Sequence, residues 1–134
     1  MNYKNSGELS GMKKGSRRIK DFHAHIYYGP KTRRVAARVR KGLAKLDVQL
    51  GSWHDEPVGP HQKSMYQVVF SPEQFGKVVP WLMLHREGLN VLVHPSTGDG
   101  EGDHLNRSLW LGEKLKLKIG VFQRARGGLT MLVL

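Results

Sequence analysis

The order of strand-like and helix-like periodicities constrains the fold of this chain more than any other feature. Four segments show the alternation and the β-branched or aromatic content that are typical of strands: 19–28, 47–53, 65–70 and 89–94. Two segments, 31–46 and 72–85, repeat apolar residues at helical spacing. The resulting order, β-α-β-β-α-β, predicts an α+β ferredoxin-like sandwich, in which a four-stranded antiparallel sheet carries both helices on one face.

Alternation along the first strand assigns its side chains to two faces. Phe22, Ala24 and Ile26 share one face, which we expect to pack against the helices. His23 and His25 therefore point together from the opposite face, which this fold leaves open. Two imidazoles on one side of one strand are oriented as two ligands of a single metal ion must be.

The fourth strand adds a third imidazole to that face. In the ferredoxin-like order this strand lies beside the first, and its Val91 and Val93 are expected to pack against the helices. His94 then shares the open face with His23 and His25, across a ladder where opposed Cβ atoms lie roughly 4.5–5.5 Å apart. The pattern predicts a metal site made by these three histidines.

The chain contains no cysteine, which limits the metals that it could bind and the cellular compartments that it fits. Without thiolates, the ligands must be nitrogen and oxygen, which suits iron(II), manganese, zinc, nickel or copper. Loop carboxylates could add an oxygen ligand or be ordinary solvated acids: Asp55, Glu56, Asp99, Glu101 and Asp103. A chain without cysteine fits a reducing cytoplasm, and the basic N-terminal stretch lacks the apolar segment of a secretory signal.

The net charge of +11 is concentrated at the two ends of the chain. Residues 1–20 hold six basic and one acidic residue, and residues 113–134 hold five and one, whereas residues 21–112 hold eleven and nine. A basic patch for nucleic acid is therefore not expected on the central domain. No apolar run approaches the ~20 residues of a membrane-spanning helix. We expect a basic, flexible arm over 1–18, one domain over 19–117 and a C-terminal extension over 118–134.

Several short motifs occur together in an order that resembles one protein family. They are Asp21–Tyr28 (DFHAHIYY), Trp53–His61 (WHDEPVGPH), Met65–Val68, Phe70–Phe75, Leu92–Pro95, Thr97–Asp99, Asp103–His104 and Trp110–Leu115. In this combination residues 19–117 resemble the DOPA 4,5-dioxygenase family. The chain departs from the family pattern at Arg107, because members often carry a second histidine soon after the Asp-His pair.

The resemblance implies extradiol cleavage of a catechol such as DOPA, with O₂ and a non-haem Fe(II) cofactor. In that reaction His23, His25 and His94 would hold the metal, and His54, His61 or His104 would accept a catechol proton as catalytic bases. An ordinary histidine pKa of ~6.5 suits this role at neutral pH.

The alternative to an enzyme is a non-catalytic ferredoxin-like binding or dimerisation module that has lost activity. In that case the histidines would line a ligand surface or a dimer surface. An exposed sheet face and two free sheet edges favour a homodimer under either interpretation.

Overall fold

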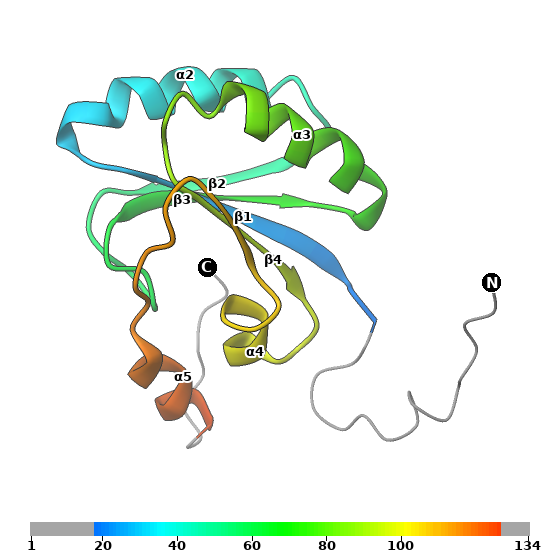
Figure 1. The fold of residues 1–134 in the computed structure, drawn as a ribbon, viewed down its shortest axis with the longest axis vertical. Helices are drawn as coiled ribbons and strands as arrows, with labels where there is room; N and C mark the ends of the chain where they lie inside the picture. The colour runs from blue at the N-terminus through cyan, green and yellow to red at the C-terminus, as the bar shows by residue number, and fades with distance from the viewer. Residues whose placement is uncertain (1–17, 127–134) are drawn as a thin grey trace.

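The computed structural model describes residues 18–126 (Figure 1). The regular elements are β1 (Asp21–Tyr28), η1 (Pro30–Thr32), α2 (Arg33–Leu43), β2 (Gln49–His54), β3 (Ser64–Phe70), η2 (Pro72–Gln74), α3 (Phe75–His85), β4 (Val91–Ser96), α4 (Gly100–His104), β5 (Leu109–Leu111) and α5 (Ile119–Arg126). The first four strands and two main helices follow the predicted order. Most of the predicted arm and the last eight residues lie outside the described residues.

The sheet is antiparallel and has the order β2-β3-β1-β4-β5. Its first four positions match the ferredoxin-like prediction, with β1 between β3 and β4. The prediction of four strands was wrong, because β5 pairs with β4 through Val91↔Leu111 and Val93↔Leu109. The strand β5 was not predicted, because three residues are too few to show the two-residue alternation of a strand.

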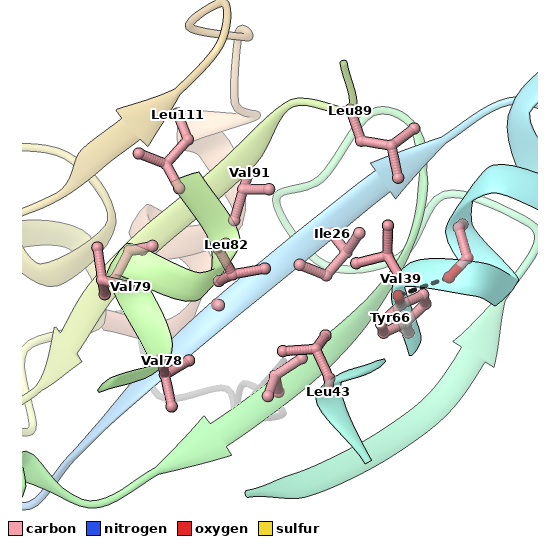
Figure 2. Close-up of a cluster of buried hydrophobic side chains, with 14 of the residues drawn as sticks. Ile26, Val39, Leu43, Tyr66, Val78, Val79, Leu82, Leu89, Val91 and Leu111 are labelled. Atoms are coloured by element: carbon pink, nitrogen blue, oxygen red, sulfur yellow. Dashed lines mark hydrogen bonds between the residues drawn. The ribbon is translucent and has the colours of Figure 1, made fainter. Parts of the chain in front are cut away.

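The two main helices cover one face of the sheet, as predicted (Figure 1). Beneath them lies the larger core, to which β1 contributes Ala24 and Ile26, both fully buried. Figure 2 shows this cluster, including Leu82 of α3 beside Ile26 of β1. The buried phenol of Tyr66 donates a 2.8 Å hydrogen bond to the Ala36 carbonyl of α2, which satisfies a polar group inside an apolar layer (Figure 2).

The opposite face of the sheet is covered, which corrects the expectation of an open face. In Figure 1, α4 and α5 lie on the side of the sheet away from α2 and α3. A second apolar cluster sits there, with Tyr27, Met65 and Leu92 at 0–3% exposure. The chain after β5 returns over this cluster through Leu115 and Leu117. The strand faces were therefore predicted correctly, while the covering layer came from segments without a strong periodic signal.

The helix α5 begins inside the segment that the sequence analysis set apart as an extension. Its Phe122 is 2% exposed, and its ring lies 5.1 Å from the ring of His104. The first turn of α5 thus packs on the domain. Within the described residues, the structure contains no helix with both the length and the apolar character required to cross a membrane.

The core beneath the helices should dominate stability. Leu82 is fully buried, whereas Leu84 on the same helix is 81% exposed. We expect Leu82→Ala to lower the free energy of unfolding by about 2–5 kcal/mol, because it removes buried methyl groups and leaves a cavity. The matched control Leu84→Ala should change it by less than about 0.5 kcal/mol. Urea unfolding of both variants measures the difference, and equal losses would contradict this core assignment.

Candidate metal centre

The strands β1 and β4 bring the three predicted metal ligands together. In the antiparallel register His23 lies directly opposite His94, and His25 lies two residues farther along β1. All three side chains are buried, with exposed fractions of 4%, 0% and 3% for His23, His25 and His94. Each offers a ring nitrogen within 4.8 Å of those of the other two.

Two more histidines reach the same place from outside the central strands. His61 comes from the loop between β2 and β3, and His104 is the last residue of α4. The ring of His61 lies 4.2 Å from that of His25, and the ring of His104 lies 4.0 Å from that of His94. We call these five residues the histidine cluster: His23, His25, His61, His94 and His104.

One pair in the histidine cluster has the spacing of two ligands of one ion. The Nε2 atoms of His25 and His94 are 3.1 Å apart. Two nitrogens bound about 2.1 Å from one metal ion in tetrahedral or octahedral geometry are separated by about 3.0–3.4 Å. The same pair without a metal would share one hydrogen bond, so the geometry fits both the loaded and the metal-free protein.

A second set of three ring nitrogens also converges within 4.8 Å, contributed by His25, His61 and His104. The histidine cluster therefore contains two overlapping ligand sets that share His25. Only the first set was predicted from the sequence, because loop histidines carry no strand register that would place them.

Backbone carbonyls fix the tautomers of two imidazoles. His94 Nδ1 donates to the Pro95 carbonyl at 2.8 Å, and His104 Nδ1 donates to the Gly100 carbonyl at 2.8 Å. A carbonyl only accepts, so in both neutral rings the lone pair is on Nε2. Such an outer hydrogen bond is the usual way in which a protein orients a metal-binding histidine.

Burial favours the neutral form of the strand histidines of the cluster. Desolvation lowers the pKa of His23, and desolvation with the neighbouring imidazoles lowers that of His25 well below the usual histidine range. Desolvation, followed by the charge of His104, lowers the pKa of His94 to about 2. Neutral imidazoles are the form that binds a metal ion.

An apolar wall with one phenol borders the histidine cluster. The Tyr27 hydroxyl lies 2.7 Å from His61 Nδ1, and burial raises the Tyr27 pKa far above its usual range. Its ring is stacked with that of Trp110 at 5.9 Å. Trp110 is partly buried on the histidine side of the sheet, where it packs against the second apolar cluster. The position of Phe122 beside the histidine cluster was not predicted, although the spacing of Ile119 and Phe122 is helical.

The remaining predicted candidates lie elsewhere. His54, at the end of β2, is half-buried and belongs to neither converging set. Asp55 accepts hydrogen bonds from Arg33 and from the Tyr28 hydroxyl, so its carboxylate is engaged away from the histidine cluster. His85, the last residue of α3, donates to the Trp81 carbonyl on the same helix.

Near the histidine cluster, Asp103 and Arg107 brace the helix α4, which carries His104. The Asp103 carboxylate is buried and accepts from the backbone and hydroxyl of Thr97 at 2.8 Å. Arg107, the position at which the chain departs from the family pattern, pairs with Asp99 and Asp103 at 3.3 and 3.1 Å. These contacts give Arg107 a bracing role for α4.

The donor set fits a divalent transition metal. It consists of buried imidazoles that contribute nitrogen ligands, and it contains no thiolate. Backbone carbonyls fix the tautomers of two of these imidazoles, His94 and His104. This composition suits iron, zinc, nickel or copper and does not suit calcium or magnesium, which prefer oxygen.

Comparisons with known proteins identify relatives of this chain. A 35% identical relative from Botryotinia fuckeliana, an uncharacterized 21.2 kDa protein, aligns with 78% of this chain and 64% of its own length. A DOPA 4,5-dioxygenase from Amanita muscaria is 31% identical over 75% of this chain and 49% of its own length. The chain thus spans about half to two thirds of these curated relatives.

A solved structure is more similar. The crystal structure of a "putative dioxygenase" from Nostoc punctiforme is 58% identical, with a TM-score of 0.79, and the match covers 80% of this chain and 94% of that one. The sequence profile of the Dopa 4,5-dioxygenase family matches residues 22–121, which contain every member of the histidine cluster. On this evidence the chain belongs to the Dopa 4,5-dioxygenase family.

Proposed function

We propose that this protein is an extradiol dioxygenase that opens the ring of a catechol such as DOPA with O₂ and a non-haem Fe(II) ion. The observation that carries the proposal is the convergence of five buried imidazoles in one place, in a chain of this family. A structural role would favour apolar side chains at such buried positions on a sheet face.

The first ligand set, His23, His25 and His94, is the proposed iron site. A divalent iron there would supply Lewis-acid and redox chemistry for the reaction of a catechol with O₂. In the overall reaction both oxygen atoms of O₂ enter the product, and the ring carbon–carbon bond beside the diol breaks to give a semialdehyde and a carboxylate.

The remaining cluster members supply the proton chemistry. His61 and His104 lie within reach of the first set, and we propose that one of them accepts a proton from a catechol hydroxyl. The Tyr27 hydroxyl, 2.7 Å from His61 Nδ1, orients that ring. His54 is less suited to this role, because it lies in neither converging set.

Apolar side chains keep bulk water out of the site. Met65 and Leu92 are fully buried beside the cluster, and Phe122 packs on His104. Exclusion of water strengthens the electrostatic interactions inside a site and protects reactive species from hydrolysis.

A reconstitution experiment tests the proposed reaction. Protein loaded anaerobically with Fe(II) and mixed with DOPA should, on admission of air, consume one O₂ per catechol and form a yellow semialdehyde. Zinc-loaded protein is the control and should show neither change, because zinc has no redox chemistry. Absence of O₂ consumption with several catechols, in protein shown to contain iron, would favour the non-catalytic binding module instead.

We also propose that the protein forms a homodimer and is located in the cytoplasm. The edge strands β2 and β5 leave two sheet edges, which favours a homodimer. The chain without cysteine fits the cytoplasm.

A further inference from the structure

Asp21 and His23 form a partly buried carboxylate–imidazole pair at the start of β1. Asp21 Oδ1 lies 3.1 Å from His23 Nε2, and the His23 side chain is 5% exposed while that of Asp21 is 25% exposed. An ionised carboxylate only accepts hydrogen bonds, so the proton of this contact belongs to Nε2 of His23. The lone pair of the neutral ring is then on Nδ1.

The other nitrogen of His23 has the environment of a metal ligand. His23 Nδ1 is buried and forms no hydrogen bond of standard geometry among the described residues. The Gln67 side chain also interacts with the His23 ring. A buried acceptor without a partner costs about 1–3 kcal/mol, so it needs an explanation. His23 belongs to the first ligand set, in which each histidine contributes one ring nitrogen.

We infer that Asp21 is a positioning residue that holds His23 in the tautomer presenting Nδ1 to the metal. His94 has the reverse arrangement, because its Nδ1 donates to the Pro95 carbonyl and its lone pair is on Nε2. Two ligands on adjacent strands thus meet the ion through different ring nitrogens. The inference rests on the metal site of the proposed function, and it does not depend on the reaction performed there.

Asp21 also connects the site to the surface. Together with Lys20, Asp47 and Gln49 it lines a cavity of about 380 Å³ at the end of the sheet. Asp47 lines the same cavity without contacting the histidine cluster, so it provides a matched control for the loss of one carboxylate.

The test uses Zn²⁺ alone as a diamagnetic probe and ¹⁵N NMR of the histidine rings. In the zinc-loaded protein we expect metal coordination at Nδ1 of His23 and at Nε2 of His94, with protons on the opposite nitrogens. In the metal-free protein the proton of His23 should already be on Nε2. Zinc coordination through Nε2 of His23, or no coordination by His23, would overturn the inference.

Substitutions separate positioning from structure. Asp21→Ala should weaken zinc binding roughly 10–100-fold, the usual effect of losing an outer partner of a metal-ligating histidine. Asp21→Asn should restore part of the affinity and the wild-type tautomer, because its amide oxygen can still accept from Nε2. Asp47→Asn should leave affinity and tautomer unchanged.

The zinc-binding and NMR measurements test the role of Asp21 separately from the catechol reaction. Unchanged zinc affinity in Asp21→Ala would refute the positioning role, even if the protein cleaves catechols. Failure of the catechol assay with the predicted tautomers in place would refute the proposed reaction and leave the role of Asp21 supported.

Discussion

Replacing His25 by Gln is expected to abolish metal binding, which would be the largest effect of any single substitution in the site. His25 belongs to both converging ligand sets and is fully buried between them. Its loss leaves either set with two nitrogens, and removing a ligand should cost more than the 10–100-fold that loss of an outer partner typically costs. Elemental analysis and competition with a chelator would measure the change in affinity.

The control for this variant is His54→Gln. It removes an imidazole from the same domain, but from a half-buried position outside both sets. Metal content should be unchanged. Because a buried substitution can impair folding, circular dichroism and urea unfolding of metal-free His25→Gln should accompany the measurement. A folded His25→Gln protein with wild-type affinity would contradict a metal site in either converging ligand set.

Two further variants decide between the ligand sets. His23→Gln removes a member of the first set only, and His61→Gln removes a member of the second set only. If the proposed assignment is correct, His23→Gln loses metal, whereas His61→Gln keeps metal, and it also loses catechol cleavage if His61 rather than His104 is the proton acceptor. The reverse pattern would move the ion to the set of His25, His61 and His104.

The strand register made part of the site predictable from the sequence. Two-residue alternation fixed the face of His23 and His25, and the split-βαβ order placed β4 beside β1, so His94 could be expected opposite. The apolar partners of these strands, such as Ile26 and Val93, are strongly patterned. The burial of these apolar residues determines the register of β1 against β4 and the face on which each histidine lies.

The other half of the site depends on segments without periodicity. His61 lies in a turn-rich loop and His104 in a five-residue helix, α4, so no local rule places either ring. The covering layer was missed for the same reason: β5 is three residues long, and Phe122 lies in a short helix near the C-terminus. Non-local packing determines these positions, and a single sequence does not display it.

The histidine cluster should also make the metal-free protein sensitive to acid. Histidines in the unfolded chain keep a pKa near ~6.5, whereas burial lowers the folded-state pKa of His23, His25 and His94. Below about pH 6.5 the unfolded state therefore binds more protons than the folded state. The stability that these groups contribute is fully present above that pH and is lost as the pH falls toward the lowered folded-state values.

The expected loss is large compared with ordinary domain stability. Each such histidine contributes up to about 1.4 kcal/mol per pH unit, so His23, His25 and His94 together contribute up to about 4 kcal/mol per unit. The free energy of unfolding of a small domain is about 5–15 kcal/mol, so lowering the pH from 7 to 5 should remove a substantial part of the stability. Urea unfolding of the metal-free protein across this range measures the slope. Equal unfolding free energies at pH 7 and pH 5 would mean that the imidazoles become protonated without loss of the fold, and the buried, neutral cluster described here would then be incorrect.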